Sequence, residues 1–210
     1  MDIKSDALII AHPLDLNFFL SLLSKPDKKE PLYLAKLFLF PSLTIVGPCL
    51  GAPQLILILE KLIKIGIKKI LFWGWCGGVD PNLKIGDIIL PLEARKNTKI
   101  FLPKRNFLNY LIANLPFSYY SGSIFSIENP YELKKETILI YQKFGIMAID
   151  METATLYEFS VKKEIEVASL LIVSDIFKPD WKEGFTHPSF KDTRKKLAKW
   201  LFEKYERKII

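Results

Sequence analysis

Short apolar runs alternate with amphipathic segments along almost the whole chain, and this alternation limits the folds available to it. Apolar runs without internal polar positions are typical of strands buried on both faces, and apolar residues three or four apart are typical of the helices that cover them. The sequence therefore predicts an α/β fold rather than a helix bundle or a β-sandwich. We expect strands over residues 7–11, 37–40, 43–46, 69–73, 87–91, 121–127, 146–149 and 167–173, and helices over 16–23, 54–65, 106–114, 132–144, 151–162 and 189–205.

The composition excludes intrinsic disorder, because half of the 210 residues are apolar and can bury enough surface to offset the entropy of ordering. The length favours one domain over residues 1–210. The net charge of +7 comes mainly from lysine, with 26 Lys and four Arg. Such an excess of cations suits nucleic acid, an acidic membrane surface or a phosphate-bearing substrate. Arginine is the usual residue for holding phosphate in two places, and the four here are Arg95, Arg105, Arg194 and Arg207.

Cysteine usage and the apolar segments indicate a cytoplasmic protein without a membrane span. Cys49 and Cys76 are too few for a disulfide framework and have no metal-ligand spacing, so we expect neither a metal nor a cofactor. Residues 1–10 do not resemble a secretory signal. The longest uncharged stretch, 37–59, is interrupted by three prolines and two glycines and reads as strand, loop and helix start.

Glycines and acids follow the predicted strands, where ligands bind in open α/β sheets. Two glycine-rich segments follow strands at 47–53 and 74–78, and glycine there permits close approach of backbone to a ligand. The remaining places are residues 11–15, 150–152 and 174–175. They hold four acidic residues, Asp15, Asp150, Glu152 and Asp175.

These segments resemble the nucleoside phosphorylases and nucleosidases, which cleave the bond between a base and ribose. The matches are a Gly-x-x-x-Gly-x-Pro loop at 47–53, a Gly-x-x-Gly-Gly segment at 74–78 followed by Ile-Gly-Asp-Ile-Ile at 85–89, a Met-Glu-x-Ala element at 151–154, and Ser174-Asp175. They occur in the family's order and spacing. The resemblance implies a three-layer sandwich with a central mixed, mostly parallel twisted sheet flanked by helices. It also implies a homo-oligomer, a dimer or higher.

The resemblance assigns roles to particular residues. Cleavage of an N-glycosidic bond needs an acid for the leaving base, groups that hold the ribose hydroxyls, and a nucleophile on the opposite face of the sugar. Asp175 would protonate or hydrogen-bond the base, with Ser174 orienting it, and burial would raise the pKa of Asp175. Glu152 would accept hydrogen bonds from the 2′ and 3′ hydroxyls, and Met151 would pack on the sugar. The base would lie against Cys76, Gly77, Pro130 and Tyr131.

The residues expected to bind phosphate differ from those of the phosphorylases. The family's loop arginine falls on Asp15, its strand arginine on Phe72, and its loop Ser or Thr on Trp75. An aspartate would repel the phosphate dianion, whereas the nucleosidases use an acid in this loop to activate water. Hydrolysis of a purine-type nucleoside, with Asp15 as the base, is therefore favoured over phosphorolysis. A nucleoside-binding protein without turnover, with Trp75 blocking the nucleophile side, is the other alternative.

Several of these residues also have plainer interpretations. Asp15 could cap a helix, Trp75 could be a packed core residue, and His12 could be incidental or a neighbour of the water site. The segment 180–185, with Trp181 at its centre, could be a lid or a surface loop. The lysines gather at 25–29 and 191–208, where they favour solubility, and no nucleic-acid or membrane motif accompanies them.

Overall fold

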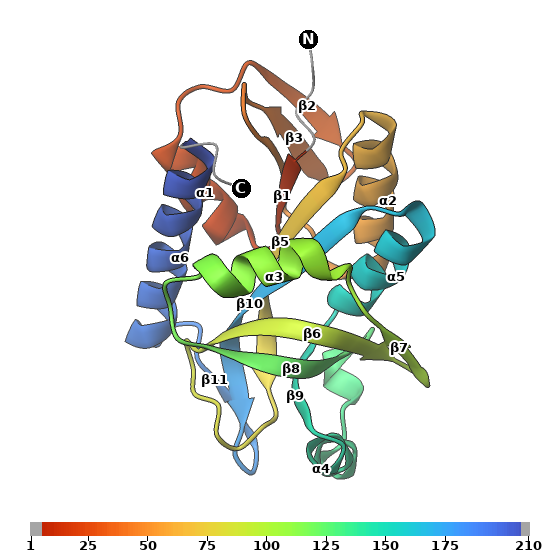
Figure 1. The fold of residues 1–210 in the computed structure, drawn as a ribbon. Helices are drawn as coiled ribbons and strands as arrows, with labels where there is room; N and C mark the ends of the chain where they lie inside the picture. Colours follow the sequence, from red (N-terminus) through yellow and green to blue (C-terminus); the bar gives the residue numbers. More distant parts are fainter. Residues whose placement is uncertain (1–5, 207–210) are drawn as a thin grey trace.

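The computed structural model describes residues 6–206, in which eleven strands form one sheet and helices cover both of its faces. Figure 1 shows α1 and α6 on one side and α2 and α5 on the other, with α3 crossing in front. Of residues 1–10, which do not resemble a secretory signal, residues 1–5 lie outside the described part of the chain. Arg207 and Lys208 also lie outside it. The helices are α1 (Pro13–Leu22), α2 (Gly51–Lys64), α3 (Arg105–Asn114), α4 (Lys135–Lys143), α5 (Thr153–Lys163), α6 (Pro188–Glu206) and a 3₁₀ turn, η1 (Pro130–Glu132).

The sheet is mixed, as expected. Its order is β11-β10-β6-β8-β9-β5-β1-β4-β3-β2, with β7 paired to β6. The longest ladder, between β5 and β10, is parallel, while hairpins such as β2–β3 and β10–β11 supply antiparallel pairs. Because β10 also pairs with β5, the strands β10, β6, β8, β9 and β5 close into a ring. The bounds are β1 (Asp6–Ile10), β2 (Lys28–Leu32), β3 (Ala35–Leu39), β4 (Thr44–Gly47), β5 (Lys69–Gly78), β6 (Ile88–Lys96), β7 (Lys99–Phe101), β8 (Tyr119–Ser126), β9 (Ile146–Asp150), β10 (Glu166–Phe177) and β11 (Trp181–Glu183).

Two predicted boundaries are wrong in a way that affects the site. Residues 74–78 were expected to form a loop but belong to β5, and Ser174 and Asp175 lie inside β10 rather than after it. The cause is tertiary: β10 pairs with β5 along almost its whole length, so the glycines continue a strand that their local preference would end. The segment 25–31, rich in Lys, Pro and Asp and therefore expected to be an exposed loop, likewise contains part of β2, and β7 and β11 are additional strands.

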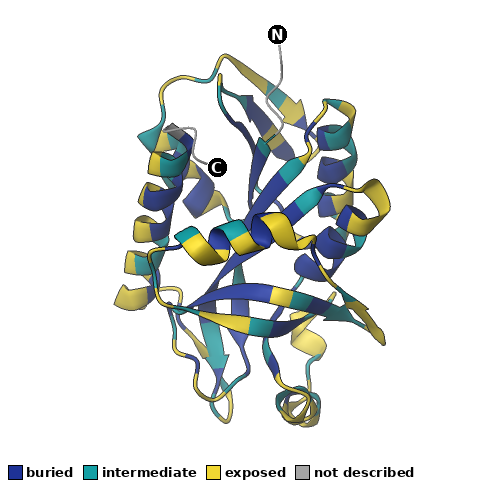
Figure 2. Ribbon diagram, in the orientation of Figure 1, coloured by how far each residue is buried: buried dark blue, intermediate teal, exposed yellow. Residues whose placement is uncertain are grey.

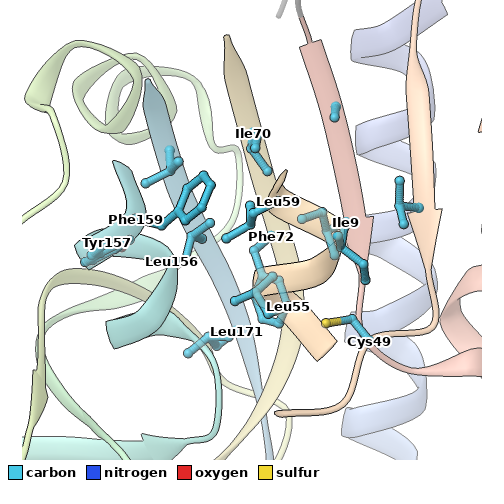
Figure 3. Packing of buried hydrophobic residues seen from close by; sticks show 14 of the residues in the cluster. Ile9, Cys49, Leu55, Leu59, Ile70, Phe72, Leu156, Tyr157, Phe159 and Leu171 are labelled. Carbon is cyan, nitrogen blue, oxygen red and sulfur yellow. The ribbon is translucent and has the colours of Figure 1, made fainter. Parts of the chain in front are cut away.

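The core lies in two layers, one on each face of the sheet. Figure 2 shows buried residues along β5 and β10 and exposed residues on the outer faces of the helices. On one face, α2 and α5 pack against the sheet through Leu55, Leu59 and Leu156, which meet Phe72 and Leu171 (Figure 3). On the other face, α1, α3 and α6 cover the sheet. This arrangement is the predicted three-layer sandwich.

The uncharged stretch 37–59 does not form a single long helix. It comprises parts of β3, β4 and α2, as its prolines and glycines predict. Within residues 6–206, none of the helices combines the length and the apolar character needed to cross a membrane.

Candidate active site

Three of the predicted segments are tied together by hydrogen bonds beside β5. The amide of Ala11 donates to the carbonyl of Trp73, and the amide of Cys49 donates to the carbonyl of Ala11, both at 2.9 Å. The amide of Gly51 then donates to Oε1 of Glu152 at 2.6 Å. The parallel strands β1, β4 and β5 bring the first two segments together at their carboxyl ends, as the sequence predicts, whereas the Glu152 segment arrives from β9, which runs antiparallel to β5.

Asp175 lies beside Gly77 in the ladder between β10 and β5. The two residues pair in register, just after a β-bulge at Val173. The Ser174 hydroxyl donates to Oδ1 of Asp175 at 2.6 Å and lies 3.2 Å from the carbonyl oxygen of Cys76. Burial raises the pKa of Asp175; the hydrogen bond from Ser174 opposes this rise, and the charge of Glu183 adds to it. The arrangement supplies a partly buried carboxyl group that holds its proton to higher pH than an exposed aspartate does.

The indole of Trp181 covers Gly77. A Cβ atom placed on Gly77 would lie 2.9 Å from Cη2 of Trp181 and 3.1 Å from Oδ2 of Asp175. Trp181 begins β11, the strand that forms a hairpin with the end of β10, and its ring packs edge-on against Phe177. Sequence reasoning left the segment 180–185 open between a lid and a surface loop; in the structure its strand places Trp181 on the residue expected to contact the base.

Replacing Gly77 by alanine is expected to destabilise the protein by about 1–3 kcal/mol, because the added methyl group overlaps the Trp181 ring. Urea unfolding measures this loss. In a Trp181→Ala background the same substitution should cost less, since the nearest ring atoms are gone. Strictly additive effects of the two substitutions would show that Trp181 does not rest on Gly77.

Glu152 is buried at the start of α5 and is held by two backbone amides. Oε1 accepts from Gly51 at 2.6 Å and Oε2 from Met151 at 3.2 Å. Burial and the nearby charge of Asp150 raise the pKa of Glu152 from its ordinary value near 4.5 to about 8, while the two amides oppose the rise. Gly51 has φ +78°, a conformation that suits glycine, and this turn aims its amide at the carboxyl group.

A second buried acid supports this helix start. Asp150 accepts hydrogen bonds from the Ser126 hydroxyl and, at 2.8 Å, from the amide of Thr153, and Ser126 accepts from the amide of Ala154 at 2.9 Å. Burial raises the pKa of Asp150, and its hydrogen bonds oppose the rise. Asp150 begins the segment 150–154 that resembles the family, and Ser126 begins a segment, 126–131, that resembles its base-facing loop; their contact across 24 residues was not predicted.

Asp15 lies in the first turn of α1 with both carboxylate oxygens engaged. Nε of Arg194 donates to Oδ1 and the indole Nε1 of Trp75 donates to Oδ2, each at 2.6 Å. Only 3% of the Asp15 side chain and 13% of the Arg194 side chain are exposed. Burial raises the pKa of Asp15, and the charge of Arg194 with the two hydrogen bonds opposes the rise. Sequence reasoning missed Arg194, which reaches this loop from α6.

His12 and three aromatic residues surround this ion pair. The His12 ring stacks on Trp75 with centroids 3.7 Å apart, and Phe185 and Phe190 also contact the indole. His12 caps α1 through Nδ1, which accepts from the amide of Leu14. Burial, followed by the charge of Arg194, lowers the pKa of His12 to about 4, so the ring is neutral at pH 7. Trp75 is thus a packed wall between His12 and α6.

The remaining predicted site residues are not all brought together. Pro130 and Tyr131 lie on η1, where Tyr131 is 96% exposed, so Tyr131 does not pack against Cys76 or Gly77. A proline at the start of η1 and a cap from the Asn129 side chain form a short turn that projects into solvent. Cys76 is buried, and burial raises the pKa of its thiol well above the ordinary range. The thiol is therefore a packing group rather than a nucleophile.

The basic surface lies elsewhere. A groove of about 410 Å³ between the end of α1 and the β2–β3 hairpin is lined by Lys25, Lys28, Lys29, Phe38 and Phe40 among others, and by no predicted site residue. Among the described residues, no group of three or more His, Cys, Asp or Glu side chains is placed to hold a metal ion.

Comparison with known proteins identifies the family. A model of the phosphorylase superfamily matches residues 24–204. The chain belongs to the phosphorylase superfamily. Its membership confirms the predicted family and its α/β fold. The matched residues include Asp175, Glu152 and Arg194 and begin after the first loop, so they do not include Asp15.

Within the phosphorylase superfamily, the chain is similar to several curated bacterial proteins. The DeoD-type purine nucleoside phosphorylase of Caldanaerobacter subterraneus subsp. tengcongensis is 26% identical over 147 aligned positions, which cover 63% of each chain. That of Buchnera aphidicola subsp. Schizaphis graminum is 28% identical over 154 positions, covering 66% of this chain and 65% of the relative. The match therefore spans slightly less than two-thirds of the length of these relatives.

Proposed function

We propose that the protein is an enzyme that cleaves the N-glycosidic bond of a purine-type nucleoside, with water as the favoured nucleophile. One observation carries the proposal: a partly buried carboxyl group, Asp175, is hydrogen-bonded to Ser174 and lies on the glycine that the resemblance assigns to the base. The names of the curated relatives support a purine nucleoside as the substrate.

The roles follow from the environments of the acids. Burial keeps Asp175 protonated to higher pH, and a protonated carboxyl group can donate to the leaving base. Glu152 is fixed by the Gly51 and Met151 amides, and its remaining lone pairs can accept from ribose hydroxyls. Because the base is expected on Gly77, the Trp181 ring must stack with it or move aside.

Asp15 is the candidate base for water. Trp75 and Gly77 are two residues apart on β5, so their outward directions coincide and their Cα atoms are about 7 Å apart. Asp15 accepts from the Trp75 indole and Asp175 lies on Gly77, so each acid contacts a residue on the same face of β5. Glycosidases likewise use two acids, one as proton donor and one as base for water, on opposite faces of the sugar.

Two alternatives lead to different products. Phosphorolysis would consume inorganic phosphate and yield ribose 1-phosphate, and the relatives' names favour it. A nucleoside-binding protein without turnover is favoured by one specific observation, the Trp181 ring that already covers Gly77.

A chromatographic screen of nucleosides with and without phosphate tests the proposal. Methylthioadenosine, adenosine, inosine, uridine and futalosine are suitable substrates for the screen. We expect release of a free purine base together with the free sugar, which is ribose or, for a 5′-substituted nucleoside, the correspondingly substituted ribose, at a rate independent of phosphate. Production of ribose 1-phosphate only when phosphate is present would establish phosphorolysis instead. Tight nucleoside binding without base release would establish the binding protein.

Assembly and location complete the proposal. The resemblance implies a homo-oligomer, a dimer or higher, and the chain's cysteine usage favours the cytoplasm. Analytical ultracentrifugation would measure the oligomeric state.

A further inference from the structure

The charges around Asp15 differ from those expected of a phosphate site. The family's phosphate-binding arginines fall on Asp15 and Phe72 in this chain, yet Arg194 reaches the same place from α6. Its Nε donates to Oδ1 of Asp15 at 2.6 Å, across 179 residues of sequence. An acid from α1 and an arginine from α6 therefore meet at this place.

The guanidinium group of Arg194 is held in place by aromatic rings as well as by Asp15. It lies over the Trp75 ring at 4.9 Å and over the Phe190 ring at 5.3 Å, and Phe190 is fully buried. Trp75 donates its own N–H group to the second oxygen of Asp15. Two donors thus converge on one carboxylate inside a frame of aromatic rings, as they would on a small oxyanion.

The ion pair is electrically neutral as a unit. His12 stacks on Trp75 and accepts a hydrogen bond from the amide of Leu14, so it adds no charge at pH 7. A phosphate dianion approaching the pair meets one negative and one positive charge at short range and gains little net attraction.

We propose that the Asp15 carboxylate is an internal anion that occupies the oxyanion site formed by Arg194 and Trp75, and thereby excludes inorganic phosphate. Asp15 thus determines which co-substrate the protein can use. That consequence rests on the proposed function, in which water attacks the sugar; the exclusion of phosphate does not, because it concerns binding alone. The role is additional to any activation of water by the same carboxylate.

Replacing Asp15 by asparagine tests the proposal. The variant keeps the side-chain shape but leaves the Arg194 charge uncompensated, so we expect it to bind inorganic phosphate at least tenfold more tightly than the wild type. Isothermal titration calorimetry with sodium phosphate, at constant ionic strength and without nucleoside, measures the affinity. Asp15→Ala provides a second variant with more space for the anion.

Two controls separate this site from general charge effects. Glu136→Gln makes the same change in net charge at an exposed position on α4, and it should not increase phosphate affinity. Adding Arg194→Gln to Asp15→Asn should abolish the new binding. The proposal is overturned if folded Asp15→Asn and Asp15→Ala bind phosphate no better than the wild type, or if the double variant retains the binding.

The wild type provides a test that does not depend on the folding of any Asp15 variant. We expect no saturable phosphate binding by the wild type. Saturable binding that disappears in Arg194→Gln would overturn the proposal, because Arg194 would then be open to phosphate despite Asp15. Absence of nucleoside cleavage would overturn the proposed function and leave these binding results unaffected.

Discussion

Asp175→Asn is expected to lower kcat for the best nucleoside substrate by two to four orders of magnitude, the usual contribution of a positioned general acid. Asparagine preserves the shape of the side chain and can still accept the hydrogen bond from Ser174, but it cannot transfer a proton to the leaving base. Affinity for the free base should change little. Steady-state kinetics and base-binding titrations together distinguish a loss of catalysis from a loss of binding.

The pH dependence of kcat in the wild type is a second test of Asp175 as the general acid. The acid is active when protonated, so kcat should fall as the pH rises through the pKa of Asp175, and burial places this fall above the range of an exposed aspartate. Asp180→Asn, at an exposed position on the same hairpin, is the matched control and should retain wild-type kinetics. Full activity in Asp175→Asn would refute the assignment of Asp175 as the acid.

The convergence of the acids could be predicted from the sequence because it depends on a regular property of α/β folds. The segments around Asp15 and Glu152 follow buried strands and Asp175 lies near the end of one, and ligand-binding residues gather near strand ends in α/β sheets. The hydrogen bonds linking Ala11 to Trp73 and Gly51 to Glu152 are local consequences of that meeting.

Contacts between distant elements could not be predicted in this way. Arg194 occupies a position on an amphipathic helix like those of its lysine neighbours, and only the packing of α6 beside α1 directs it to Asp15. The three residues of β11 are too few to show a periodicity, so the placing of Trp181 on Gly77 had no signal. The extension of β5 through its glycines depends on pairing with β10, and this pairing cannot be predicted from the local preferences of the residues.

Glu152→Gln is expected to remove a pH-dependent loss of stability on the order of 5 kcal/mol. The pKa of Glu152 is raised from near 4.5 to about 8 in the folded protein. The folded state therefore binds more protons than the unfolded state between these values, and the free energy of unfolding falls as the pH rises from 4.5 to 8. Glutamine resembles the protonated acid and can still accept from the Gly51 amide. Urea unfolding of both proteins at several pH values between 5 and 9 measures the difference.

The pH dependence of stability also involves Asp150, because its carboxyl group lies close to that of Glu152 and its negative charge raises the pKa of Glu152. Wild-type stability should fall steeply toward pH 8, whereas Glu152→Gln should fall less and be the more stable protein at that pH. Glu158→Gln changes an acid on the outer side of the same helix, ion-paired with Lys162, and should keep the wild-type slope. Equal slopes in wild type and Glu152→Gln would refute the raised pKa. If Glu152→Gln is more stable than the wild type at pH 8 and has lost activity, Glu152 destabilises the fold and serves to act on the substrate.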